Sequence, residues 1–354
     1  MKIAVTADTH LTTRAKNAER FNALQNILSQ LQEKEIGHLI VAGDLFDQGT
    51  QDYSEFEALC REHSQIQFHI VPGNHDPAIR QDHIVVENVH VYSEPEVVFL
   101  DPEVPILFVP YELGLSMGES IAAREEQIKE QKWVLVGHGD YYGGVKERNP
   151  HEPGTYMPLA RKDIERFRPR TVLLGHIHKS ISIGNIHYPG SPCGLDINET
   201  GKRTFLVFDT DSQAVEHYEI DTDVLFFNES FVVLPHEDEI ADLRQRIQER
   251  IGTWGIGEKD YEKVQVRVTA TGYSSNRSAI LNTLKDGFSR FAFYGGEHPS
   301  TDQLFVSEDQ QLLAIATKTR ERIEHLSWGI GEDEPDKDEI LRVALSVIYG
   351  EEGR

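Results

Sequence analysis

Short runs of mainly apolar residues recur along the first half of the chain, and polar residues follow each run. The runs occupy residues 3–5, 39–42, 68–71, 133–136 and 172–174. Continuous runs of this length are typical of β-strands that are buried on both faces. We therefore expect these segments to form the buried strands of an α/β core.

Segments with helical spacing lie between these runs. Residues 17–33 carry apolar side chains three and four positions apart, which predicts an amphipathic helix that covers a sheet. Residues 53–63, 119–132 and 159–167 predict further helices.

Additional strand-like segments occur between and after these elements. They lie at residues 89–92, 97–100, 106–109, 181–183, 205–208 and 215–218. These strands are too many for one parallel sheet. We predict an α/β fold in which two facing mixed β-sheets are flanked by helices.

A different pattern of strand-like and helical segments begins near residue 222. Strand-like residues 231–234 and 264–268 alternate with helical stripes over 240–251 and 280–288, and residues 291–294 close the unit. An α+β unit of this size is a small accessory domain, which either caps a site or only stabilises the chain.

The chain is thus expected to divide into residues 1–221, 222–296 and 297–354. The last part contains fourteen acidic and six basic residues, and its apolar positions predict helices over 312–323 and 340–348. An acidic linker, Gly329 to Asp338, separates the two helices. Such paired amphipathic helices either dock on a partner or form a plain helical lid.

Residues suited to metal binding follow the five buried strands. The motifs are Asp8–His10, Gly43–Asp47, Gly73–Asp76, Gly137–Asp140 and Gly175–His178. Open α/β sheets bind ligands beyond the carboxyl ends of their strands, so five such motifs in order are not a chance set of turns. Carboxylates, imidazoles and one amide suit Mn²⁺, Fe, Zn²⁺ or Co²⁺. Two such ions about 3.5–4 Å apart catalyse phosphoryl displacement, which predicts hydrolysis of a phosphate ester.

Over residues 1–210 the order and the residue sequences of these motifs resemble those of the calcineurin-type metallophosphoesterase superfamily. This superfamily has a four-layer sandwich fold. Within it, Gly43–Asp47 and Tyr188–Pro192 resemble the SbcD-like DNA repair exonucleases. The resemblance implies two divalent metal ions, with Mn²⁺ expected.

The resemblance also implies a role for each motif residue. Asp8, His10 and His178 would hold the first ion, Asn74, His138 and His176 the second, and Asp44 would bridge both. His75 would protonate the leaving oxygen or stabilise the transition state, and Asp76 would orient His75 and tune its charge. The residue chemistry agrees, because a carboxylate has two oxygens with which to bridge and an imidazole titrates near neutral pH.

Two other carboxylates belong to the same motifs. Asp47 stands where some related nucleases carry a histidine, so it supports either the site or only the local fold. Asp140 follows His138 and is expected to partner a ligating imidazole.

The resemblance implies a DNA exonuclease or endonuclease that acts in double-strand-break repair or end processing. Its expected partners are DNA and an SbcC-type coiled-coil ATPase, and a homodimer stays open. The alternative is a small-molecule (cyclic) nucleotide phosphodiesterase with the same metals, although an accessory domain after residue 222 favours a polymeric substrate. A protein phosphatase is disfavoured, because Gln48 stands where that class needs an arginine.

The formal charge of −24 is unusual for a nucleic-acid enzyme. The charge is uneven, however, since residues 141–203 contain ten basic and six acidic residues. The densest basic positions are Arg161, Lys162, Arg166, Arg168, Arg170 and Lys179. They form either a phosphate-tracking surface or the solvated face of a short helix.

The number of cysteines and the hydropathy of the chain indicate its expected cellular location. Cys60 and Cys193 are too few for a disulfide framework. Residues 1–7 lack the features of a secretory signal, and no run is long enough to span a membrane. We expect a cytoplasmic protein.

Overall fold

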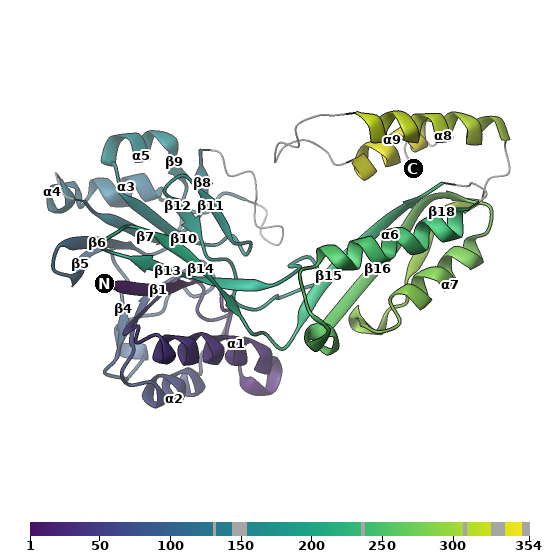
Figure 1. Cartoon of the computed structure of the whole chain (residues 1–354). Helices are drawn as coiled ribbons and strands as arrows, with labels where there is room; N and C mark the ends of the chain where they lie inside the picture. The colour runs from purple at the N-terminus through teal and green to yellow at the C-terminus, as the bar shows by residue number, and fades with distance from the viewer. Residues whose placement is uncertain (130–131, 144–153, 235–237, 307–309, 327–336, 349–354) are drawn as a thin grey trace. The chain divides into compact units, whose positions relative to one another are not determined.

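The computed structural model describes residues 1–129, 132–143, 154–234, 238–306, 310–326 and 337–348. The chain forms two compact units (Figure 1). The first comprises Met1–Leu195 and Lys202–Val224, and the second comprises Asp196–Gly201 and Leu225–Arg354. The chain therefore enters the second unit briefly at residues 196–201 before it returns to the first.

The first sheet of the first unit has the strand order β14-β13-β1-β2-β3-β4. Its strands are β1 (Lys2–Thr6), β2 (His38–Ala42), β3 (Gln67–Val71), β4 (Val89–Val91), β13 (Arg203–Asp209) and β14 (Val215–Ile220). β1 to β4 are parallel, whereas β13 runs antiparallel to β1. The carboxyl ends of β1, β2 and β3 consequently lie at one edge of the sheet.

The second sheet has the order β11-β12-β10-β7-β6-β5. Its strands are β5 (Glu96–Asp101), β6 (Val104–Val109), β7 (Val134–His138), β10 (Thr171–Gly175), β11 (Ile181–Ile183) and β12 (Ile186–Tyr188). β6, β7, β10 and β12 are parallel. A small pair, β8 (Tyr141–Tyr142) and β9 (Leu159–Ala160), lies outside this sheet.

The two sheets face each other across a core of alternating apolar residues, which includes Val5, Ile40, Phe108 and Val136. Helices cover the outer faces. α1 (Arg14–Glu33) and α2 (Ser54–Glu62) pack on the first sheet, and α3 (Met117–Ala122) and α5 (Arg161–Phe167) belong to the second side. The predicted arrangement of two mixed sheets flanked by helices is confirmed.

The single helix predicted over residues 119–132 is wrong over residues 119–129, and residues 130–131 lie outside the described residues. The structure has α3 and a short α4 (Glu125–Ile128), separated at Arg124, whose φ of −117° is not helical. α3 begins earlier than predicted, because Ser116 and Glu119 form a capping box there.

The second unit is built on a sheet of β15 (Leu225–Val233), β16 (Val264–Ser274), β17 (Ala292–Phe293) and β18 (Ser300–Val306). β16 pairs in parallel with the other three strands. α6 (Glu239–Thr253) and α7 (Arg277–Gly287) cover one face and contribute Leu243, Ile247, Ile280 and Leu284 to the core. The pattern of residues 231–294 indicated this unit but not β18.

The opposite face of this sheet is partly covered. α8 (Gln310–His325) and α9 (Lys337–Ile348) pack through Ala316, Ile323, Leu341 and Leu345 against Val232 and Tyr273. Both helices match predicted positions, and residues 329–336 of the expected linker lie outside the described residues. Within the described chain, no helix is sufficiently long and apolar for a membrane span.

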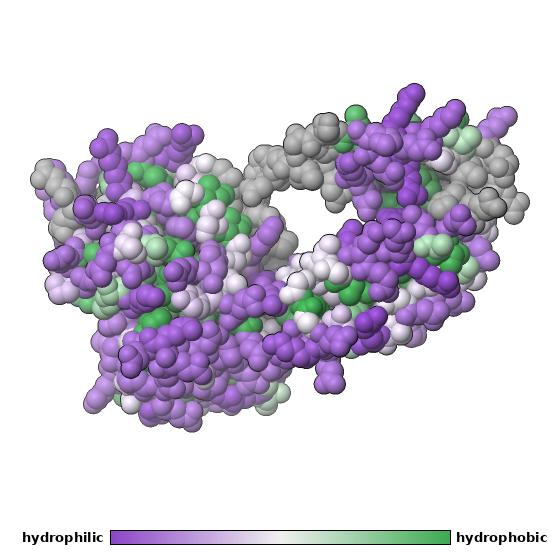
Figure 2. Space-filling model, viewed as in Figure 1, coloured by the Kyte–Doolittle hydropathy of each residue, from purple (hydrophilic) through white to green (hydrophobic). Residues whose placement is uncertain are grey.

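The visible faces of both units are mainly hydrophilic, with scattered apolar residues (Figure 2). This surface agrees with the charged composition of the chain, in which 27% of residues are Asp, Glu, Lys or Arg.

Candidate metal centre

The predicted metal-binding residues come together where the strand ends of the two facing sheets meet. β1, β2 and β3 present Asp8–His10, Asp44 and Asn74–His75, while β7 and β10 present His138 and His176–His178. The loops are joined directly, since Asp8 N donates to Gly43 O at 3.0 Å and His10 N to Asp44 O at 3.0 Å. Parallel topology therefore converts five separated motifs into one cluster.

The backbone of this cluster is strained. Asp8, His10, Asp44 and His176 have φ values of 54°, 45°, 51° and 96°, a region that non-glycine residues rarely occupy. Such conformations persist only where surrounding contacts impose them, and they concentrate at functional sites. One of these contacts is the bond from His176 N to Asp8 Oδ1 at 3.0 Å.

Glycine is required at two positions next to the cluster. A Cβ on Gly43, whose φ is +94°, would lie 2.0 Å from His138 Nδ1, and one on Gly73 would lie 2.1 Å from Asp44 Oδ1. No side chain fits at these distances, so both glycines allow the loops to approach the ligands closely.

Asp8, His10 and His178 form the first group. Each offers a ligand atom, and these atoms lie within 4.8 Å of one another. His10 Nε2 is 3.3 Å from His178 Nε2, and His178 Nε2 is 3.9 Å from Asp8 Oδ1. All three residues are buried.

Asn74, His138 and His176 form the second group. The Asn74 Oδ1 atom lies 2.8 Å from His138 Nε2 and 3.2 Å from His176 Nδ1. His138 Nδ1 is 2.9 Å from Ala42 O, an acceptor that requires the proton to be on Nδ1. With a metal bound, the ring would be neutral and would present the lone pair of Nε2 to the ion.

Asp44 lies between the two groups. Its Oδ2 atom is 3.7 Å from His10 Nε2 and 3.4 Å from His138 Nε2, and its side chain is buried. This position is the one that a bridging carboxylate requires.

His75 contacts the cluster and an acidic partner. Its backbone N donates to Asp44 Oδ1 at 2.8 Å, and its Nδ1 lies 3.1 Å from Asp47 Oδ1. The hydrogen bond with His75 holds the pKa of Asp47 well below its usual range. His10, Asp44 and His75 also offer ligand atoms within 4.8 Å of one another, so His75 lies at the edge of the ligand cluster.

The carboxylate of Asp76 joins two loops. It accepts hydrogen bonds from Phe46 N at 3.0 Å and Gly73 N at 2.7 Å. These bonds fix the loop that carries Asp44 against the loop that carries Asn74 and His75. Asp47 also contacts His75 directly, and the role of Asp76 in orienting His75 stays a prediction.

Two supporting residues carried no sequence signal. Arg20 on α1 donates to His10 O and lies 3.5 Å from Asp47 Oδ2, and Tyr156 packs its ring 4.6 Å from that of His176. Asp140 accepts from Tyr156 N at 2.8 Å, and its other oxygen is 3.8 Å from His176 Nε2. Arg20 and Tyr156 lie outside the five motifs, so only the fold reveals their contacts with the site.

Burial makes these groups strongly interdependent. It raises the pKa of Asp8 to about 6 and, with repulsion from Asp44, that of Asp76 to about 7. It lowers the pKa of His10 to about 3. For His138, burial opposes the charged form, but attraction to Asp44 outweighs it and raises the pKa to about 10. Clustered carboxylates and imidazoles are a donor set that divalent cations fit.

Two of the six residues of the expected basic surface are paired with acids. Arg161 Nε is 3.0 Å from Glu165 Oε1, and Arg166 Nη2 is 2.7 Å from Glu125 Oε2. These pairs favour the interpretation of α5 as a solvated helix face.

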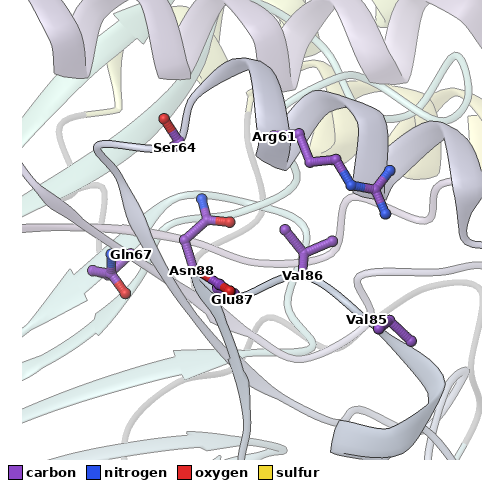
Figure 3. A pocket seen from close by; sticks show the side chains of 7 residues that line it. All are labelled: Arg61, Ser64, Gln67, Val85, Val86, Glu87 and Asn88. Atoms are coloured by element: carbon purple, nitrogen blue, oxygen red, sulfur yellow. The ribbon is translucent and has the colours of Figure 1, made fainter.

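A pocket elsewhere in the first unit lies between the end of α2 and the chain that leads into β4 (Figure 3). Two of its polar side chains are already engaged. Asn88 donates to the carbonyls of Cys60, His63 and Ile66, and Arg61 pairs with Glu57 at 2.7 Å. This arrangement stabilises the end of α2 and contains none of the proposed metal ligands.

Comparison with known proteins identifies the class. Residues 1–180 match the calcineurin-like phosphoesterase family, and the chain belongs to this family. The protein is therefore a hydrolytic phosphoesterase of a family that uses divalent metals.

No curated protein sequence matches the chain. Similar solved structures include a crystal structure with 14% identity and a TM-score of 0.40, which covers 62% of this chain and 99% of its own. Another comes from the characterisation of a novel archaeal phosphodiesterase, with 12% identity, a TM-score of 0.35, and coverage of 62% and 100%. The family assignment rests on the match over residues 1–180.

Proposed function

We propose that this protein is a dinuclear-metal-dependent DNA exonuclease or endonuclease that hydrolyses phosphodiester bonds during end processing or double-strand-break repair. The observation that carries the proposal is that the candidate metal ligands cluster in one unit of a chain that also has a second folded unit. All clusters of possible metal ligands among the described residues lie in the first unit. A second unit of this size without such a cluster is suited to positioning a large substrate.

The chemistry at the centre follows from the residues. Asp8, His10 and His178 would hold one ion, Asn74, His138 and His176 the other, and Asp44 both. Two divalent cations, for which we propose Mn²⁺, would polarise the phosphate and lower the pKa of a bound water. His75 then acts on the leaving oxygen, because its contact with Asp47 keeps a proton on Nδ1 and leaves Nε2 to exchange one.

The SbcD-like assignment is supported by the loop after the last ligand motif. Ser191 N donates to His178 O at 3.1 Å, so the segment Tyr188–Pro192 folds back on a ligand-bearing loop. The residue sequence of this segment resembles that of the SbcD-like exonucleases.

A partner surface is proposed on the C-terminal helices. Val343 and Val347 of α9 are 57% and 71% exposed and lie one turn apart. We assign this apolar edge to docking of an SbcC-type coiled-coil ATPase, in keeping with the resemblance.

One assay series tests the proposed substrate. Purified protein with Mn²⁺ is offered linear duplex DNA, single-stranded circular DNA, cyclic nucleotides and a chromogenic phosphodiester. The proposal requires release of nucleotides or nicks from DNA at a rate above that for cyclic nucleotides. Efficient hydrolysis of cyclic nucleotides with intact DNA would instead identify the small-molecule phosphodiesterase. His75→Ala serves as the inactive control in every arm.

A further inference from the structure

The uncovered part of the sheet in the second unit carries a row of polar side chains. Ser230 on β15, Thr269 on β16 and Ser300 on β18 are cross-strand partners on the face opposite α6 and α7. Apolar residues of the same sheet face the helices and fill the core. This half of the sheet thus exposes hydroxyl groups where a covered sheet would carry apolar ones.

A pocket of about 430 Å³ lies over these hydroxyls, within the range of small-ligand sites. Its wall consists of residues from three strands and one helix. They are Ser230, Thr269, Ala270, Thr271, Ser300, Asp302, Gln303 and Arg342. The pairing of β16 with β18 shifts register between Thr269 and Thr271, an irregularity of the type that often borders binding sites.

Thr271 provides the most specific signal. It is 8% exposed, and its Oγ1 atom has no hydrogen-bond partner among the described residues. A buried hydroxyl without a partner costs about 1–3 kcal/mol, so a ligand that accepts its hydrogen would remove the penalty. Valine has nearly the same shape and would avoid the penalty altogether.

Arg342 supplies a cation at the same pocket. It lies on α9, is exposed, and forms no ion pair with any residue in the described part of the chain. The carboxylate in the pocket, Asp302, is 3.1 Å from Arg277 Nη2 and accepts a hydrogen bond from Ser300 Oγ. Thr269 Oγ1 likewise donates already, to Glu229 O at 3.4 Å. The groups left to donate to a ligand are therefore the Arg342 guanidinium, the hydroxyls of Ser230 and Thr271, and the side-chain amide of Gln303.

From this donor-rich pocket we infer a binding site for a phosphate group, contributed by a nucleic-acid strand or by a free nucleotide. Guanidinium groups bind phosphate through paired N–H donors, and hydroxyls complete the shell. The site lies outside the metal centre, so it would hold a substrate or effector without taking part in hydrolysis.

Binding is measured on the full chain in EDTA, which keeps metals from recruiting phosphate to the catalytic centre. The probes are a fluorescent single-stranded DNA oligonucleotide, AMP and inorganic phosphate. Arg342→Gln should weaken oligonucleotide binding about tenfold and reduce its salt dependence by about one ion. The matched control is Arg322→Gln, an exposed arginine on the neighbouring helix α8, which should change affinity less than twofold.

Thr271→Val should change stability and ligand affinity in opposite directions. Without ligand, the variant should melt at the same or a higher temperature than the natural chain, whereas its affinity for the oligonucleotide should fall several-fold. Variant-dependent binding of AMP or phosphate but not of the oligonucleotide would identify a free nucleotide as the ligand. Unchanged affinity in Thr271→Val, or equal losses in Arg342→Gln and Arg322→Gln, would overturn the inference.

Discussion

His75 Nδ1 lies 3.1 Å from Asp47 Oδ1, beside but separate from the seven residues that we assign to the metals. Asp47 is also 3.5 Å from Arg20, so its carboxylate is anchored from a second side. This pairing orients the imidazole next to Asp44. It also explains why Asp47 occurs in the motif with Asp44.

Removal of the His75 ring should separate catalysis from metal binding. His75→Ala is expected to lower kcat about 10²- to 10⁴-fold, the range for general acid–base residues, with two metals still bound. Metal content by plasma mass spectrometry and turnover on a chromogenic phosphodiester provide the measurements. His298→Ala, an exposed histidine of the second unit, is the control. Loss of about one metal per chain would show that His75 is a ligand.

Asp44→Ala should be more damaging than the loss of any other single ligand. The change removes the negative charge that lies between both groups of ligands, so both ions lose affinity. Calorimetric titration with Mn²⁺ should show weakened binding of both ions, whereas His178→Ala should weaken mainly one. Two tightly bound ions and normal turnover in Asp44→Ala would exclude the bridging role.

Gly43→Ala should impair metal binding through a steric clash. The added Cβ would lie 2.0 Å from His138 Nδ1 and must displace that ring. Gly49 follows in the same loop with φ of +82° but has open space around its Cβ position. Gly49→Ala therefore reports the backbone strain alone, and it should retain Mn²⁺ affinity. Equal Mn²⁺ affinities in the two variants would contradict the steric explanation.

The second unit should serve substrate positioning and not the phosphoester chemistry. A chain ending at Val224 keeps every proposed ligand and His75. It should still hydrolyse a small phosphodiester, while cleavage of duplex ends falls by orders of magnitude as orientation is lost. Circular dichroism must first show that the shortened chain is folded. Equal losses on both substrates in a folded chain would assign the unit a structural role.

His69 should make the protein sensitive to acid. Its ring nitrogens lie 3.0 Å from His38 Nδ1 and 2.8 Å from Tyr92 Oη. Burial, with repulsion from His38 and His90, lowers its pKa from 6.5 to about 3. Between about pH 6.5 and pH 3, His69 is therefore protonated in the unfolded chain but neutral in the folded chain.

The stability that the folded chain gains from keeping His69 neutral is fully present above pH 6.5. It is lost as the pH falls from 6.5 toward 3. Each pH unit in that window removes about 1.4 kcal/mol for one such group. Urea unfolding of His69→Gln between pH 7 and 5 should show a shallower decline than the natural chain. His298→Gln should leave the slope unchanged. A slope in His69→Gln that equals that of the natural chain would place the acid sensitivity elsewhere.

The residue pattern alone was sufficient for most elements of the first unit. Continuous apolar runs predicted β1, β2, β3, β7 and β10, because strands buried on both faces exclude polar side chains. The prediction failed for residues 119–132, where local capping at Ser116 and the break at Arg124 override helical spacing. It also missed β18, in which buried Thr301 and Leu304 are separated by exposed Asp302 and Gln303, so its apolar residues do not alternate.

The sequence by itself determined the ligand types and the order of the motifs, and hence the phosphoesterase class. Only the tertiary structure decided which groups meet. The pairing of His75 with Asp47, the bond from Phe46 N to Asp76, and the contact of Tyr156 with His176 all join residues from different motifs or from outside them. Strand spacing predicts that loops share an edge, but side-chain contacts depend on how two sheets pack. That packing is a property of the whole core and is not encoded in any single motif.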